Sequence, residues 1–432
     1  MSAFGVVLAT AILIVLIVIE FPIAFAFAAA SVTLATVTGR DLGLVLPTAF
    51  WQTGGFALLA LPLFIIAGTV MRSAQISDRL VAVVERVAGR VKGRLGAVTV
   101  GSCMVFGAIS GSGAAAIAAI GSVMIPKMED AGYGRGYATA LVACSSVLAL
   151  LIPPSIPMIV FALTAGISVS AAFLSTVGPA FVIAIAYVAI NRRFAGRHSV
   201  DGGRSFVKGR DPSFAKLLLR GGPALLMPVL ILGGIYSGAF TPTEAAAVAL
   251  VYAIAVGLLV YRTLGIRTLG RAFVESGAIC ASVIAILFFL LIFGQLLSLE
   301  AIPRKIATAM LSVTENYVLL LLMINLVLLV LGMFIDDISG SILAAVILMP
   351  VATGIGVDPI HFAAIVGTNL GMGNVTPPCA PLLFVAGSVG GVELRQFIRP
   401  ALRFVLLGHL PVVLLVTYVP ELSLTLPSLL RD

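Results

Sequence analysis

The sequence FGAISGSG at Phe106–Gly113 lies inside an apolar segment but carries glycines and hydroxyl side chains that a lipid-facing helix avoids. A second interruption, LIPPSIP at Leu151–Pro157, places prolines in the middle of another apolar segment. Backbone leaves helical geometry at membrane depth only where protein or a water-filled cavity satisfies the freed N–H and C=O groups. These two interruptions therefore predict a binding site that the protein itself encloses.

A matching pair of interruptions lies in the other half of the chain, at Leu331–Ser341 (LGMFIDDISGS) and Asn374–Pro381 (NVTPPCAP). Pro154 and Pro378 are 224 residues apart, and further pairs of Pro, Gly and Phe residues repeat that spacing. A spacing close to half of the 432 residues indicates an internally duplicated chain. Interrupted helices at matching positions of two halves are typical of a transporter site near the bilayer midplane.

The composition is that of a polytopic membrane protein. Hydrophobic residues make up 60% of the chain and charged residues 10%, against about 25% charged residues in an average soluble protein. The first apolar run starts near Met1 without the charged region and cleavage site of a signal peptide, so we predict a true span. The basic residues behind the net charge of +8 lie mostly in short loops, where membrane orientation accounts for them, and no nucleic-acid binding is expected. The four cysteines and three histidines lack the spacing of a disulfide framework or a zinc site.

Hydropathy predicts an all-α fold of two inverted repeats, each with five membrane crossings and one re-entrant hairpin. A crossing needs about 20 mostly apolar residues, and the apolar segments beside each tip are shorter than that. We therefore predict hairpins at Leu95–Ile125 and Val318–Thr353, and interrupted spans at Gly136–Ala165 and Ile360–Gly387. Because five is odd, the second repeat is inverted relative to the first.

The remaining segments complete this plan. We expect a connector at Gly39–Thr53 before a span at Gly54–Met71. Ser77–Lys92 and Ile302–Val313 are amphipathic and are predicted to lie at the membrane interfaces. The predicted units are a first repeat (1–191), a cytoplasmic linker (192–220) and a second repeat (221–432).

The basic residues give the predicted orientation. Of the 26 Lys and Arg residues, 22 fall on one side of the predicted membrane. The positive-inside rule makes that side cytoplasmic. Both termini then face the outside.

The first tip and break hold candidate sodium ligands. Ends of broken helices bring partial charges to the midplane, where helix N-termini favour anions and C-terminal carbonyls favour cations. The hydroxyls come from the tip, and the carbonyls are freed because proline supplies no N–H. The candidates are Ser110, Ser112 and the carbonyls of Ala149, Ile152 and Pro154.

The second tip and break supply the corresponding set. Its candidate sodium ligands are Gly332, Thr376 and the carbonyls of Gly373 and Cys379. We expect the substrate beside the same tips and breaks. The candidate substrate-binding residues are Gly113, Ser155, Asn374, Pro378 and Asp337.

Two acidic pairs allow more than one interpretation. An ionisable residue inside the membrane, such as Asp336 or Asp337, indicates a proton carrier or an ion ligand. Alternatively, the tip faces external water, or one of the two carboxylates caps the following half-helix. Glu20 and Glu244 match at the same spacing, and helix capping accounts better for them than transport chemistry does.

Four stretches resemble the large membrane subunit of tripartite ATP-independent periplasmic (TRAP) transporters, over essentially the whole chain. They are FGAISGSGAAAIAAIGSVMIPKMEDAGY at Phe106–Tyr133, FTPTEAAAVALVYA at Phe240–Ala253, GNVTPPCAPLLFVAG at Gly373–Gly387 and LLALPLFIIAGTVM at Leu58–Met71.

The resemblance implies an elevator-type, sodium-driven transporter in a bacterial inner membrane, with both termini periplasmic. It would take a small organic acid from a periplasmic binding protein and would need a small membrane subunit as partner, with sodium as coupling ion and no cofactor. The moving transport domain would be 95–165 plus 318–387, and the rest the scaffold. Members usually carry glycine just before the first break, whereas this chain has Leu148–Leu150 (LAL), which leaves the carbonyl ligands of the first site open. On matching positions the sodium ligands are Ser110 and the carbonyls near Ala149 and Ile152, then Gly332, Gly373, Thr376 and Cys379.

Three other classes compete with this interpretation. A stand-alone dicarboxylate or citrate carrier of the same architecture would need no binding protein. A channel is disfavoured by the duplicated hairpins and by the lack of a carbonyl or charge ring motif. An enzyme is not expected, because no His/Ser/Asp or metal constellation falls at the midplane.

Overall fold

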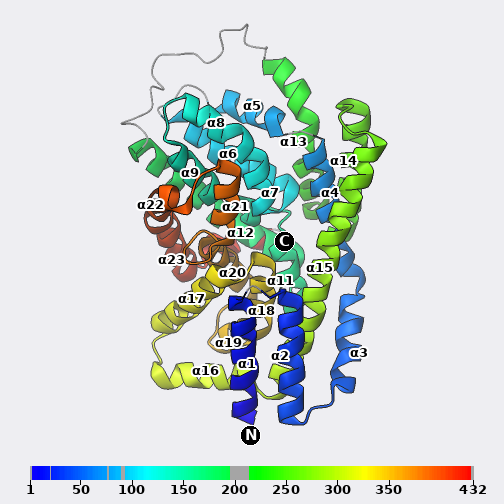
Figure 1. The fold of residues 1–432 in the computed structure, drawn as a ribbon, viewed down its shortest axis with the longest axis vertical. Coiled ribbons are helices and arrows are strands. Elements are labelled where there is room, and N and C mark those ends of the chain that lie inside the picture. The colour runs from blue at the N-terminus through cyan, green and yellow to red at the C-terminus, as the bar shows by residue number, and fades with distance from the viewer. Residues whose placement is uncertain (1, 20, 75–76, 89–92, 195–213, 430–432) are drawn as a thin grey trace.

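The computed structural model describes residues 2–19, 21–74, 77–88, 93–194 and 214–429. Over these residues the chain is all-α, without a strand, which confirms the predicted fold class (Figure 1). Among them, seven helices are long and apolar enough to cross a membrane, or eight when the bent pair Arg135–Leu151 and Ile156–Ala165 counts as one span. Most of the predicted linker 192–220 lies outside the described residues.

The helices are named in chain order in Figure 1. The first half holds α1 (Ser2–Val18), α2 (Ile23–Thr38), α3 (Leu42–Thr53), η1 (Phe56–Leu59), α4 (Ala60–Ser73), α5 (Ser77–Val87), α6 (Arg94–Ser110), α7 (Gly113–Ala116), η2 (Ile117–Gly121), α8 (Ser122–Asp130), α9 (Arg135–Ser146), α10 (Leu148–Leu151), α11 (Ile156–Ala165) and α12 (Val169–Phe194). The second half holds α13 (Phe214–Tyr236), α14 (Pro242–Ala255), η4 (Val256–Val260), α15 (Ile266–Leu299), α16 (Ile302–Val313), α17 (Tyr317–Phe334), α18 (Asp337–Leu343), η5 (Ala344–Leu348), α19 (Met349–Gly354), α20 (Pro359–Gly373), α21 (Pro381–Gly390), α22 (Leu394–Phe404), η6 (Val405–His409), α23 (Leu410–Tyr418) and α24 (Glu421–Ser428).

The helix order of the second half follows that of the first. Helices α7 and α18 begin 224 residues apart, as do α9 and α20. Each half holds a hairpin, α6 to α8 and α17 to α19, followed by an interrupted helix, α9 to α11 and α20 to α21. Figure 1 shows α5 and α8 toward one end of the long axis and α16 and α19 toward the other. The inverted orientation of the two halves across a membrane stays a prediction.

One segment differs from the sequence prediction. The expected connector Gly39–Thr53 is helix α3 from Leu42 on, and Asp41 caps it by accepting a hydrogen bond from Gly43 N at 2.8 Å. Pro47 lies inside this helix. Membrane helices tolerate proline because neighbouring groups satisfy the freed backbone. The matching segment of the second half is the continuous helix α15.

The helices pack in two groups. Helices α1 to α4, α14 and α15 pack against one another, whereas α12 packs along α6, α10, α11 and α20, and α22 packs on α9. Helices α12 and α22 therefore belong with the hairpins and interrupted helices. This second group is larger than the transport domain predicted at 95–165 plus 318–387, whose movement stays a prediction.

The interrupted helices of the two halves make a close contact. Val147, between α9 and α10, faces Gly371 of α20, and a Cβ at Gly371 would lie 2.4 Å from Val147 Cγ1. Small residues at helix contacts let two backbones approach closely. Glycine at this position therefore permits the observed packing.

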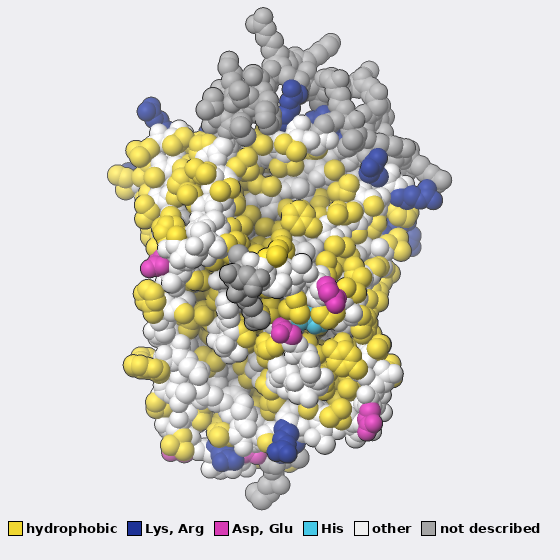
Figure 2. Space-filling model, turned by 180° about the vertical axis from the view of Figure 1, so that it is seen from behind, with side chains coloured by type: hydrophobic (Ala, Val, Ile, Leu, Met, Phe, Trp, Pro, Cys, Tyr) yellow, Lys and Arg dark blue, Asp and Glu magenta, His cyan; other side chains and the backbone are white. Residues whose placement is uncertain are grey.

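The surface carries the pattern of a multi-pass membrane protein. Figure 2 shows hydrophobic side chains over most of one face, with Lys and Arg concentrated toward the two ends of the long axis and a few acidic side chains near the centre. The two segments predicted to be amphipathic helices are helical where described, as α5 and α16.

Candidate functional site

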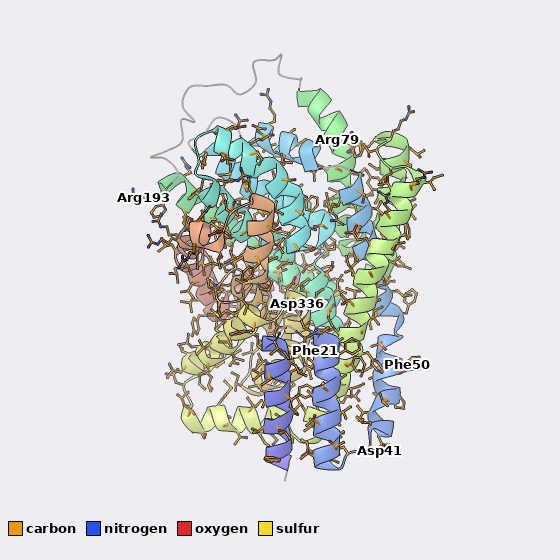
Figure 3. All side chains as sticks on the ribbon, in the orientation of Figure 1. Phe21, Asp41, Phe50, Arg79, Arg193 and Asp336 are labelled. Carbon is orange, nitrogen blue, oxygen red and sulfur yellow. The ribbon has the colours of Figure 1, made fainter. Side chains whose placement is uncertain are left out.

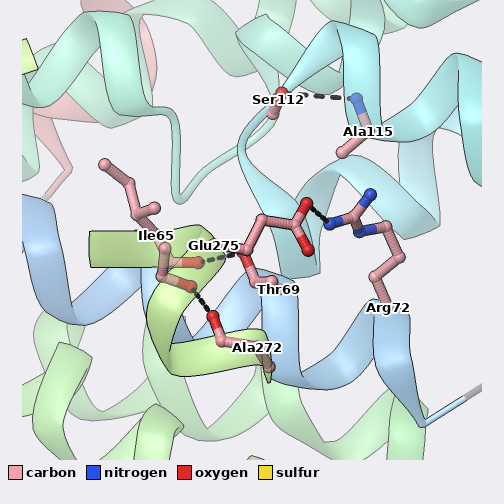
Figure 4. Close-up of polar contacts among 8 residues, drawn as sticks. Ile65, Thr69, Arg72, Ser112, Ala115, Ala272 and Glu275 are labelled. Carbon is pink, nitrogen blue, oxygen red and sulfur yellow. Dashed lines mark hydrogen bonds and ion pairs between the residues drawn. The ribbon is translucent and has the colours of Figure 1, made fainter. Parts of the chain in front are cut away.

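The first hairpin turns at Gly111, whose φ of 60° lies in the left-handed region that favours glycine. Ser112 Oγ accepts a hydrogen bond from Ala115 N at 3.4 Å and so caps α7 (Figure 4). Ser110 is 5% exposed, and its Oγ accepts a long hydrogen bond from Ser112 N at 3.5 Å. Both predicted hydroxyl ligands therefore lie at the tip, and both keep lone pairs for a cation.

The first break packs directly against this tip. A Cβ at Gly111 would lie 2.4 Å from the carbonyl oxygen of Pro154, and Ile156 N donates to the Gly111 carbonyl at 3.4 Å. Helix α6 approaches α10 as closely, because a Cβ at Gly107 would lie 2.3 Å from Ala149 Cα. The structure thus brings the hydroxyls and the candidate carbonyls of the first half together.

Two carbonyls of α10 lack their helical donors, because the residues four positions further on are the two prolines of the break. The Ser155 hydroxyl donates to the Leu150 carbonyl and accepts from Met158 N at 3.4 Å, so Ser155 caps α11. No hydrogen bond among the described residues replaces the donor lost to the Ala149 carbonyl. Of the predicted first-half ligands, this carbonyl has the clearest vacancy for a cation, and Ile152 beside it is buried.

The second tip and break also touch backbone to backbone. A Cβ at Gly373 would lie 2.5 Å from the Cα and the carbonyl carbon of Gly332. Ala380 N donates to the Met333 carbonyl at 3.2 Å, which ties the end of the break to the hairpin. Each half therefore contains a glycine contact between a hairpin and an interrupted helix.

The other predicted ligands of the second half lie along this break. The half-buried Thr376 donates from Oγ1 to the Met372 carbonyl at 2.6 Å, and its N–H donates to the Gly373 carbonyl at 2.9 Å. Pro378 and Cys379 are exposed. The Thr376 hydroxyl can still accept a cation through its lone pairs.

Unpartnered polar atoms collect at the second tip and break. Both amide atoms of Asn374 are buried without a hydrogen-bond partner, and so are Ser339 Oγ and Asp336 Oδ1. Buried polar atoms without a protein partner indicate a bound water, ion or ligand. The contact between Gly332 and Gly373 brings the tip and the break together, so these atoms define the strongest candidate site of the described chain.

The two aspartates of the second tip differ in their contacts. Asp336 caps α18, because its Oδ2 accepts from Ile338 N at 3.1 Å and from Ser339 N at 3.2 Å. The capping alternative is therefore confirmed for Asp336. The half-buried Asp337 carboxylate makes no hydrogen bond to the described residues, which leaves it available to a ligand.

The candidate sites of the two halves adjoin each other. A Cβ at Gly113, the first residue of α7, would lie 3.1 Å from Leu382 Cδ1 of α21. On the other side of the first tip, a Cβ at Gly68 of α4 would lie 3.2 Å from Ser110 Cα. One turn further along α4, Arg72 forms an ion pair with Glu275 of α15 (Figure 4).

The sequence analysis missed a buried polar network in the second half. Asn325 Oδ1 accepts hydrogen bonds from Asn369 Nδ2 at 2.6 Å and from Thr417 Oγ1 at 3.1 Å. A second set joins Tyr187 OH to His409 Nδ1 at 2.9 Å, and His409 Nε2 to the Thr368 carbonyl at 3.0 Å. Isolated polar residues in apolar segments gave no periodic signal for these contacts.

We expect Asn325→Leu to lower the stability of the protein by about 1–2 kcal/mol, because it leaves the Asn369 amide and the Thr417 hydroxyl without their shared acceptor. Thermal unfolding of the purified protein in detergent measures this. Asn374→Leu is the matched control, since the Asn374 amide has no partner to lose: it should keep the stability but lower uptake. Equal destabilisation by both variants would contradict the assignment.

Other predicted features are also placed by the structure. Thr241 and Glu244 form a capping box at the start of α14, which confirms the capping interpretation of Glu244, whereas Glu20 lies outside the described residues. Cys103, Cys144 and Cys280 are buried and Cys379 is exposed, all as free thiols. The described residues hold no group of three His, Cys, Asp or Glu residues placed to bind a metal ion.

A family model settles the relationship of the chain to known proteins. The model described as "Tripartite ATP-independent periplasmic transporter, DctM component" matches residues 10–422. The chain belongs to this family. It is therefore related to transporter permeases rather than to known enzymes, and the resemblance noted in the sequence is confirmed.

Relatives of DctM type share about a third of their residues with the chain. It is 35% identical to the C4-dicarboxylate TRAP transporter large permease protein DctM of Pseudomonas aeruginosa, over 86% of each protein. It is also 35% identical to the sialic acid TRAP transporter large permease protein SiaM of Vibrio cholerae, over 87% of each. The isethionate TRAP transporter permease protein DctMQ of Oleidesulfovibrio alaskensis is 35% identical over 91% of the chain, but the chain spans only 61% of that longer protein.

The fold has a solved counterpart. The YdaH transporter of Alcanivorax borkumensis superposes with a TM-score of 0.61, covering 89% of this chain and 90% of that one, at 16% sequence identity. At this identity the likeness concerns the fold alone, and it supports an all-α membrane transporter architecture.

Proposed function

We propose that this DctM-family chain is the translocating subunit for sodium-coupled uptake of a small organic anion. Isethionate, C4-dicarboxylates and sialic acid, named for its relatives, are all small organic acids. The observation that carries the proposal is the set of unpartnered polar atoms of Asn374, Ser339 and Asp336 at the second tip and break. An anion with hydroxyl or carboxylate oxygens would satisfy such donors and acceptors.

Sodium is proposed as the coupling ion, and no further cofactor is invoked. The free carbonyl of Ala149 and the hydroxyl of Ser110 offer oxygen ligands in the first half, as Thr376 does in the second. These oxygens are neutral, and a sodium ion beside the substrate would offset the charge of the anion. An elevator movement of the second packing group against α1 to α4, α14 and α15 would carry both across the membrane.

The proposal includes two partners and a location. A periplasmic binding protein would deliver the substrate, and a small membrane subunit would complete the permease, as the fused name DctMQ indicates for the longer relative. The chain would span a bacterial inner membrane with both termini on the periplasmic side, according to the positive-inside count.

Reconstitution tests this function. Proteoliposomes that contain the chain and its small subunit should take up a labelled organic acid only when both the binding protein and a sodium gradient are present. Sialic acid, isethionate and C4-dicarboxylates form the first substrate panel. Uptake that persists without the binding protein would favour the stand-alone carrier.

We expect Ser110→Ala and Thr376→Ala each to raise the sodium concentration for half-maximal uptake by about tenfold, the equivalent of one oxygen ligand at about 1.4 kcal/mol. Initial uptake rates against sodium concentration give the measurement. Ser112→Ala is the control, because its hydroxyl already caps α7. Unchanged sodium dependence in both variants would remove these positions from the ion sites.

A further inference from the structure

The break between α3 and α4 lies on the outside of the molecule. Gly54 and Gly55 interrupt the helix, and the side chains around them point outward: Phe50 is 73% exposed, Trp51 83% and Phe56 70%. Figure 3 shows Phe50 at the outer edge of α3, directed away from the other helices. The first group of helices therefore presents a non-helical segment together with large aromatic side chains.

The break falls at the middle of a long uncharged segment. No charged residue occurs from Leu42 to Met71, between Asp41 at one end and Arg72 at the other. In Figure 1 α3 and α4 run one after the other along the same length as α15. Helix α15 covers the matching positions without interruption. The duplicated architecture therefore does not require a break here.

Lipid alone does not suit such a surface. A helix that ends at Thr53 leaves its last carbonyls without helical donors, and only short turns such as Gly54 N to the Phe50 carbonyl at 3.0 Å bridge the gap. Non-helical backbone at membrane depth is tolerated where protein covers it, not where hydrocarbon does. The exposed Gln52 amide adds to this requirement, because it forms no hydrogen bond within the described chain.

The shape of the break can accept another helix. A cleft of about 120 Å³ opens between the break and α15. Small residues at 54 and 55 let a neighbouring backbone approach, and a polar side chain such as Gln52 forms an interhelical hydrogen bond. The cleft is lined by Thr53, Leu58, Leu59, Pro62, Ile284 and Leu287.

We propose that the surface formed by Phe50 to Leu59 docks a transmembrane helix of the small membrane subunit. The inference rests on the proposed function for the identity of that partner. A partner helix would pack on the two glycines, pair with the Gln52 amide and shield the freed carbonyls. The relative that extends well beyond this chain carries the DctMQ name, which supplies a partner of the required kind.

Photocrosslinking in the intact complex tests the docking site. The affinity-tagged chain is coexpressed with the small subunit of the same transporter, and p-benzoylphenylalanine is incorporated singly at Trp51 or Phe56. The matched controls are Ile185 and Leu406, which are 68% and 54% exposed on the second packing group. We expect an adduct of the two subunits from positions 51 and 56 and its loss at 185 and 406.

Copurification provides a second measurement that does not depend on the crosslinker. Phe50→Ala/Trp51→Ala and Gln52→Leu should each lower the amount of small subunit recovered with the tagged chain by about tenfold. Ile185→Ala should leave the recovery unchanged. The amount of tagged chain in the membrane serves as the folding control, since these side chains make few contacts within the chain.

Each outcome decides between the two proposals. If the subunits copurify but positions 51 and 56 give only lipid adducts, or adducts with a second copy of this chain, the docking inference is wrong and the proposed function stands. If no small subunit copurifies with the unmodified chain and that chain transports alone, the tripartite function itself is wrong.

Discussion

Replacement of Gly373 by alanine is expected to reduce uptake at least tenfold while the chain still inserts into the membrane. The added Cβ would lie 2.5 Å from two backbone atoms of Gly332, so the hairpin has to move away from the interrupted helix. A shift of about 1 Å in a positioned group can lower a rate by about 100-fold in enzymes. The same displacement here would separate the unpartnered atoms of Asn374 and Ser339.

Gly354→Ala is the matched control for this experiment. Gly354 also belongs to the second hairpin, has no atom within 4 Å of a Cβ built on it, and does not adopt a positive φ. Its uptake should match that of the unmodified protein in the same proteoliposomes. Normal uptake by Gly373→Ala would show that the close contact between tip and break is not part of the transport site.

A disulfide between the two packing groups is expected to stop transport reversibly. A Cβ at Gly294 of α15 would lie 3.3 Å from Val346 Cβ of the second hairpin, near the range of about 3.5–4.5 Å found in disulfides. Oxidation of the Gly294→Cys/Val346→Cys variant should reduce uptake at least tenfold, because an elevator movement has to separate these elements. Reduction should restore uptake.

The control disulfide lies inside the second group. A Cβ at Gly371 would lie 3.8 Å from Val147 Cβ, so Gly371→Cys/Val147→Cys can form the same bond without joining the two groups. Both variants are made in a Cys379→Ser background, because Cys379 is the exposed native thiol. If the cross-group disulfide forms fully and uptake persists, a local gating mechanism replaces the elevator model.

The breaks were predictable because their cause is local. Proline lacks an N–H, so the carbonyls four residues before each Pro-Pro pair lose their donors whatever the rest of the chain does. The same holds for the capping box at Glu244. These short-range rules are sufficient to locate both tips and both breaks from the amino-acid sequence.

The contacts between tips and breaks could not be predicted in the same way. The approach of Gly332 to Gly373, or of Gly113 to Leu382, depends on how segments far apart in sequence pack. The helical nature of α3 was missed because Pro47 and the two glycines that follow are typical of a loop in water. The partners of Asn325 lie 44 and 92 residues away, beyond the reach of any periodic pattern.

The contact between Val147 and Gly371 bears on the origin of the chain. The two positions are 224 residues apart and therefore correspond in the duplicated sequence, yet they touch each other. A chain built from two copies of the present first half would set valine against valine there, with no room for both side chains. The two halves have thus diverged into complementary parts, and neither can now take the place of the other.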